Sequence, residues 1–246
     1  MSENKKRCIT DDLSDMDTKT LMDALPSYWG SFGNIFSSAF LHCRFDFSRD
    51  IEGRFFSMAE GYFEASIELI ERCLENRRGN RADIWIFPIL FNIIHGIEIY
   101  LKGFNSLYRI HAGLKNEEKR PESKIEGKHN IRQLCQVAIK MLRDNKEAEL
   151  LDEMLFVEKF IDILCENVDE KDMDFARYPI KRNKDTHFYA HAKPGDEENV
   201  TINLNVLCQW VLRIFKILDV ISWGIANEIE DMEEWRAEMI REHGLY

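Results

Sequence analysis

Residues 84–108 read IWIFPILFNIIHGIEIYLKGFNSLY. This stretch is apolar nearly all round, which is typical of a helix that its neighbours cover on every side. It also contains His95, Glu98 and Lys102, which are costly at the centre of a bilayer. We therefore expect this stretch to be the central, most buried helix of the protein rather than a membrane span.

Helical patterns flank this stretch on both sides. Asp83 is expected to cap the central helix. Pro88 is tolerated only near a first turn, so it should lie close to the start of this helix. Elsewhere apolar residues recur at spacings of three and four, as on one face of a helix. An acidic tail helix is expected at the C-terminus. Long helices in this order predict an all-α antiparallel bundle. The four further ranges with helical spacing are 55–78, about 130–142, about 146–167 and 204–229.

One segment interrupts the helical pattern. HFYAHA at 187–192 and NVTINLN at 199–205 are short β-branched or aromatic stretches, and KPGDEE separates them. A strand, a turn with Pro-Gly and a second strand form the pattern of a β-hairpin. We expect a small hairpin over about 176–203, inserted before the last long helix. The expected parts of the chain are an N-terminal arm and aromatic lead-in at 1–50, the helical bundle at 51–230 and the acidic tail helix at 231–246.

The cysteines and the N-terminal residues indicate the cellular compartment of the protein and the kinds of site that it can form. The six cysteines are scattered without a CxxC pair, which is typical of buried, reduced thiols in a cytosolic protein. Ligand pairs at the short spacing of zinc sites are missing, so neither a metal nor another cofactor is expected. No apolar stretch follows the basic residues near the start, so a secretory signal is not expected. These features predict a cytoplasmic protein.

Charge is distributed unevenly along the chain. The formal net charge is −11, and such an acidic total opposes non-specific binding of nucleic acid. Residues 176–193, by contrast, hold five Lys or Arg and only one acidic residue, Asp185. This basic island has two interpretations: it contacts a phosphate, or it packs against the acidic helix before it.

Three segments, in order, resemble the HEPN superfamily of helical bundles. They are HGIEIYLKGF at 95–104, GKHNIRQL at 127–134 and FARYP at 175–179. Many bacterial HEPN-like proteins have comparable H-x-x-E-x-x-x-K, K-H-x-I/L-x-x-L and F-R-Y-P segments. Here Ala176 is inserted before Arg177. The resemblance covers roughly residues 55–225 and implies a bundle of the HEPN type.

The polar residues of the first segment form a stripe on one side of the central helix. Glu98 and Lys102 are a favourable pair four residues apart, and His95 lies one turn earlier. On an apolar helix such a stripe must find polar partners. We expect a structural polar cluster that fixes the bundle, and a substrate pocket is the alternative. The candidate partners are His129, Arg177 and Tyr178.

A possible catalytic string follows the third segment. It reads Arg182-Asn183-Lys184-Asp185-Thr186-His187. It resembles the motif of active HEPN proteins, in which Arg is followed directly by Asn, Asp or His, and a His comes after four to six intervening residues. The resemblance implies RNA cleavage without a metal, often by two protomers together. Histidine can move the proton of the 2′-hydroxyl or of the leaving oxygen, and arginine can stabilise phosphate charge. Asn183 could orient either residue.

Neighbouring residues supply a candidate substrate-binding surface. Lys181 and Lys184 would attract the phosphate backbone, as would Arg177, and Tyr189 could stack on a base. His191 is an alternative catalytic histidine on the same strand face as His187.

We therefore predict a HEPN-like endoribonuclease of a prokaryotic defence or toxin system. The alternative is a catalytically silent module that binds a partner protein or a nucleotide. The expected partners are RNA, an operon partner protein and a second copy in a homodimer.

Overall fold

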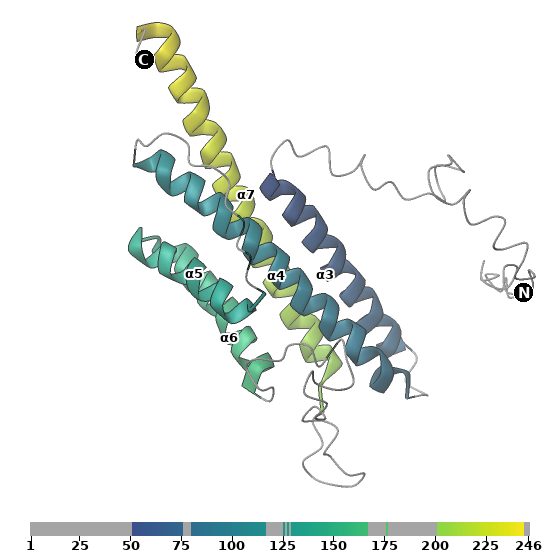
Figure 1. Ribbon diagram of the computed structural model, residues 1–246. Coiled ribbons are helices and arrows are strands. Elements are labelled where there is room, and N and C mark those ends of the chain that lie inside the picture. The colour runs from purple at the N-terminus through teal and green to yellow at the C-terminus, as the bar shows by residue number, and fades with distance from the viewer. Residues whose placement is uncertain are drawn as a thin grey trace, which may run out of the picture. The chain divides into compact units, whose positions relative to one another are not determined.

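The structure is a computed structural model that describes residues 51–75, 80–116, 129–166 and 201–243, together with residues 125, 127 and 176 (Figure 1). No strand occurs in these ranges. The predicted all-α helical bundle is confirmed as the fold class. All five helices belong to the same compact unit of the chain. They are α3 (Ile51–Glu75), α4 (Arg81–Lys115), α5 (Ile131–Asp144), α6 (Ala148–Glu166) and α7 (Leu204–His243).

Helix α4 is the centre of the bundle. It packs against α3, α5 and α7 (Figure 1). From Ile93 to Leu114 all but a few of its residues are buried, and the apolar ones include Ile97, Leu101 and Phe104. The predicted central helix is thus confirmed, although it begins slightly earlier and continues to Lys115.

Among the described residues, α4 is also the one helix whose length and apolar composition would allow it to cross a membrane. Over its most apolar window, 56% of the residues are buried inside the bundle. A core helix of a globular protein has the same composition, because it too exchanges water for apolar neighbours. The packing of α3, α5 and α7 around α4 accounts for this composition.

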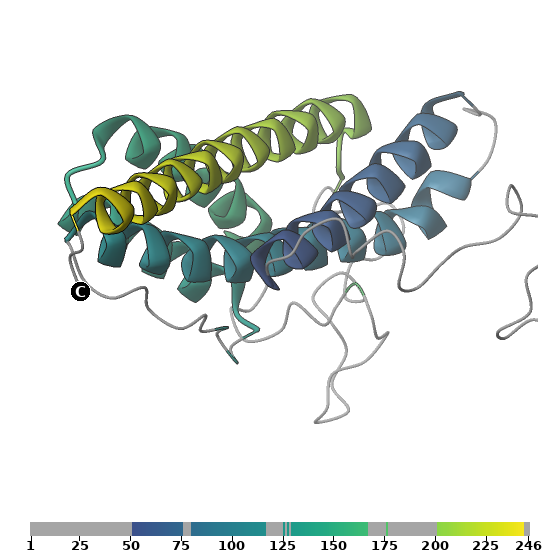
Figure 2. The same cartoon turned by 90° about the horizontal axis from the view of Figure 1, so that it is seen from above.

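The helices do not all alternate in direction, which corrects the prediction of an antiparallel bundle. Glu98 contacts His129 just before α5, and Lys115 contacts Glu147 just after it. α5 therefore runs parallel to α4. Figure 2 shows that α7 also runs along α4 in the same direction. Short connections join the antiparallel pairs α3–α4 and α5–α6, whereas the chain between α4 and α5 and between α6 and α7 is long enough to return to the starting end.

The β-hairpin expected over 176–203 lies almost entirely outside the described residues. Ala176 has 3₁₀-helical geometry, and residues 201–203 form no strand. Asn203 instead caps α7, because its side-chain oxygen accepts the backbone N–H groups of Asn205 and Val206. The part of the expected hairpin that the structure describes therefore does not support it.

Two helices extend beyond what the sequence pattern predicted. α7 continues without a break through the acidic tail expected at 231–246, at least as far as His243. Residues 225–243 contain neither Gly nor Pro and are rich in good helix formers. Pro88 lies inside α4 rather than near its first turn. It removes a hydrogen bond to the carbonyl of Ile84, but both residues are exposed, so water can reach that carbonyl.

The described cysteines are free thiols. Cys73 and Cys135 are buried, and Cys208 is partly buried. Burial raises the pKa of the Cys135 thiol, and the carboxylates of Glu158 and Asp162 raise it further. Such a thiol behaves as a small apolar core residue. The others, Cys8, Cys43 and the side chain of Cys165, lie outside the described residues.

Gly103 allows α3 to approach α4 closely. A Cβ atom at this position would lie 2.8 Å from Cε1 of Phe56 and 2.9 Å from Cβ of Phe55. We expect Gly103→Ala to lower the free energy of unfolding by about 1–3 kcal/mol through overpacking. The matched control is Gly61→Ala in α3, where nothing lies within 4 Å and helix propensity should add about 0.5–1 kcal/mol. Urea unfolding measures both, and a stabilising Gly103→Ala would contradict the close approach.

Candidate functional site

Polar residues of α4 meet a residue that precedes α5 in a single cluster, which we call the Glu98 cluster. Lys102 Nζ donates to Oε1 of Glu98 at 2.8 Å. Nδ1 of His129 lies 2.9 Å from the same oxygen. Nδ1 of His95 lies 3.7 Å from the other carboxylate oxygen, Oε2. The structure thus brings together four residues that the sequence analysis singled out, from two segments of the chain.

The members of the Glu98 cluster differ sharply in exposure. The side chains of Glu98 and Lys102 are each 11% exposed, whereas that of His129 is 82% exposed. Two charges withdrawn from water depend on each other, because either one alone would be buried without compensation. His129 therefore presents its imidazole to solvent while one ring nitrogen is held by a buried carboxylate.

Local structure explains the position of His129. The next residue, Asn130, is the N-cap of α5, and its side chain accepts the backbone N–H of Gln133 at 3.0 Å. The start of α5 is tied to α4 because Asn105 Nδ2 donates to the carbonyl of Leu134 at 3.1 Å. The cap and this buried hydrogen bond fix where the chain enters α5, and His129 lies directly before that point.

His95 sits against aromatic rings at the edge of the Glu98 cluster. Its ring centroid is 4.6 Å from that of Tyr62, edge to face, and 5.5 Å from that of Phe91, stacked. These contacts join α3 to α4 on the side of Glu98 and limit the rotation of the His95 ring. His95 therefore has a packing role in addition to its contact with the carboxylate.

The predicted catalytic residues Arg182, Asn183 and His187 lie outside the described residues, and their roles stay predictions. The same holds for the candidate substrate-binding residues and for one candidate partner of Glu98. These are Arg177, Lys181, Lys184, Tyr189, His191 and Tyr178.

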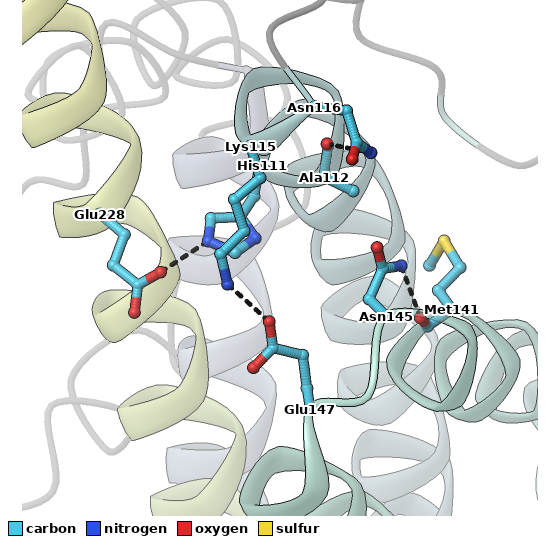
Figure 3. Close-up of polar contacts among 8 residues, drawn as sticks. All are labelled: His111, Ala112, Lys115, Asn116, Met141, Asn145, Glu147 and Glu228. Atoms are coloured by element: carbon cyan, nitrogen blue, oxygen red, sulfur yellow. Dashed lines mark hydrogen bonds and ion pairs between the residues drawn. The ribbon is translucent and has the colours of Figure 1, made fainter.

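A second polar cluster, which the sequence analysis did not single out, lies at the C-terminal end of α4 (Figure 3). Nε2 of His111 is 2.6 Å from Oε2 of Glu228 on α7. Lys115 Nζ donates to Oε1 of Glu147, between α5 and α6, at 2.7 Å. The His111 side chain is 2% exposed, and Glu228 is largely exposed. These contacts connect α4 to α7 on one side and to the turn between α5 and α6 on the other.

Buried polar atoms near His111 have no hydrogen-bond partner among the described residues. They are Nδ1 of His111 and the hydroxyl of Tyr108, whose ring centroid lies 5.6 Å from that of His111. Burial raises the pKa of Tyr108 to about 12, with the carboxylates of Glu147 and Glu228 contributing. The neutral phenol is thus strongly favoured in the fold, but a buried hydroxyl without a partner is itself unfavourable.

We therefore expect Tyr108→Phe to raise the free energy of unfolding by up to about 1 kcal/mol near neutral pH. Because the folded-state pKa of Tyr108 is raised, the free energy of unfolding of the parent is unaffected by this titration below pH 10 and falls as pH rises toward about 12, where the unfolded phenol ionises more readily than the buried one. The variant should lose less stability than the parent over that range. Urea unfolding at neutral and alkaline pH measures both effects, and a marked loss at neutral pH would show that the hydroxyl has a partner.

No group of three or more His, Cys, Asp or Glu that could hold a metal ion occurs in the part of the chain that the structure describes. Comparisons with protein-family models, with curated proteins and with solved structures find no match to this chain.

Proposed function

We propose that this protein is a HEPN-like endoribonuclease that cleaves RNA without a metal and serves a prokaryotic defence or toxin system. One observation supports the proposal: the first two HEPN-like segments meet in space. Glu98 of HGIEIYLKGF accepts hydrogen bonds from Lys102 in the same segment and from His129 of GKHNIRQL. Polar residues of these two segments are thus in contact. The link from this arrangement to RNA cleavage rests on the resemblance.

In this proposal Arg182 and His187 carry the reaction. His187 transfers a proton at the 2′-hydroxyl or at the leaving oxygen, and Arg182 stabilises the charge on the phosphate. Asn183 orients one of the two. Attack of the 2′-oxygen on phosphorus leaves a 2′,3′-cyclic phosphate on one fragment and a 5′-hydroxyl on the other.

The test is incubation of the purified protein with a mixed RNA pool in EDTA. We expect cleavage with cyclic-phosphate ends by the parent, and a loss of about 10²–10⁴-fold in His187→Ala and in Arg182→Ala. His191→Ala is assayed beside them, because His191 is the alternative histidine. Cleavage that persists in His187→Ala and disappears in His191→Ala would reassign the histidine. An intact RNA pool with the parent would count against the enzyme.

A second candidate function is a catalytically silent module that binds a partner protein. The observation that favours it is three exposed apolar side chains on α7, on the side opposite the face that enters the core. They are Leu212, Val220 and Trp223, and Trp223 is 65% exposed. A large exposed aromatic ring among them is a candidate anchor for a partner protein. Under this alternative the parent leaves RNA intact, and Trp223→Glu loses copurification with a coexpressed operon partner. A homodimer is expected under either function.

A further inference from the structure

The imidazole of His129 is exposed to solvent, yet it contacts the buried carboxylate of Glu98. A purely structural cluster gains little from such a member, because an ion pair that remains in water contributes little to stability. Lys102 already pairs with Glu98 in the buried part of the cluster. The arrangement does, however, fix the orientation of an imidazole whose opposite edge reaches solvent.

The contact also fixes which ring nitrogen carries the proton. A carboxylate oxygen can only accept, so Nδ1 of His129 donates to Oε1 of Glu98 at 2.9 Å. In the neutral imidazole the other nitrogen, Nε2, then holds the lone pair. A buried carboxylate that holds Nδ1–H and leaves Nε2 to act as a base is the division of roles found in catalytic carboxylate–histidine pairs.

We infer that His129 is the general base that activates the 2′-hydroxyl of RNA, and that Glu98 is its positioning residue. This inference rests on the proposed function and assigns a step that it left open. The α5 helix begins two residues after His129, so a phosphate beside the imidazole lies near the partial positive charge of a helix N-terminus.

Nε2 of His129 takes the proton of the 2′-hydroxyl, and the 2′-oxygen forms a bond to the adjacent phosphorus. The bond from phosphorus to the 5′-oxygen breaks, and that oxygen takes a proton from a general acid. The products are a 2′,3′-cyclic phosphate and a 5′-hydroxyl, with no oxidant and no cofactor needed.

The test compares single-turnover RNA cleavage by His129→Gln, His129→Ala and the parent in EDTA. Because the imidazole is 82% exposed, both variants should fold with the unfolding temperature of the parent. We expect the rate of each variant to fall at least about 100-fold. Free imidazole should restore part of the rate of His129→Ala, which a merely structural role would not allow. Gln136→Ala, an exposed change on α5, is the matched control and should cleave like the parent.

Three results would overturn the inference, and they are distinguishable. If His129→Gln cleaves at the parental rate while His187→Ala does not, the role of His129 is wrong and the proposed function stands. If His129→Gln loses activity together with its unfolding temperature, and imidazole restores nothing, His129 is structural. If the parent leaves RNA intact, the proposed function fails and the role of His129 fails with it.

Discussion

Glu98→Ala is expected to lower the free energy of unfolding by about 3–5 kcal/mol. The substitution removes the carboxylate that accepts from Lys102 at 2.8 Å, and the side chain of Lys102 is 11% exposed. A buried ammonium group would then have lost its countercharge, which is the costly situation for an ion pair withdrawn from water. Urea unfolding followed by circular dichroism measures the effect.

Two control variants test whether the loss of stability comes from leaving a buried charge unpaired or simply from losing an ion pair. Glu68→Ala removes an exposed pair with Arg72 of nearly the same length, 2.7 Å, and should cost no more than about 0.5 kcal/mol. The double variant Glu98→Met/Lys102→Met replaces both charges by apolar chains and should be about as stable as the parent or more stable. If Glu98→Ala cost as little as Glu68→Ala, the Glu98 cluster would not be buried as described.

Phe63→Ala is the second substitution with a large expected effect, again about 3–5 kcal/mol. Phe63 on α3 is fully buried, and its ring stacks on Phe215 of α7 with centroids 5.3 Å apart. It also lies 6.4 Å from the ring of Tyr100 on α4. The side chain thus joins three helices at one point, and its removal leaves a cavity that no single helix movement can close. Thermal or urea unfolding provides the measurement.

The matched control for Phe63→Ala is Met58→Ala on the same helix. Met58 is 47% exposed, so its truncation should change the free energy of unfolding by no more than about 0.5 kcal/mol. Comparable losses in the two variants would show that α3 does not pack against α7 through Phe63.

The sequence predicted the central helix because residues 84–108 are apolar on every side, and apolar spacing predicted a helix from about residue 130, where α5 begins at Ile131. It ended the central helix too early. His111 and Lys115 make the next turns look polar, yet they find partners at Glu228 and Glu147, far along the chain. No local pattern reveals a partner separated by so many residues.

The members of the Glu98 cluster were predictable from the sequence, but the exposure of His129 was not. The Glu98–Lys102 pair is local, four residues apart on one helix, so spacing alone indicated it. His129 was one of three candidate partners of Glu98, and the structure confirms this contact, which depends on the parallel packing of α5 along α4. The exposure of His129 depends on the same packing. For this reason the sequence pointed to a structural cluster, and only the structure indicated an imidazole available to a substrate.

The most direct measurement of the central claim, that Glu98 holds His129 through Nδ1, is the tautomer of the His129 imidazole. Nitrogen NMR of protein labelled at histidine, at a pH where the ring is neutral, reports which nitrogen carries the proton, and His129→Gln identifies the signal. The expected result is a proton on Nδ1 and a free lone pair on Nε2. A proton on Nε2, the form preferred by an unrestrained imidazole, would contradict the claim and remove the basis for a general base at this site.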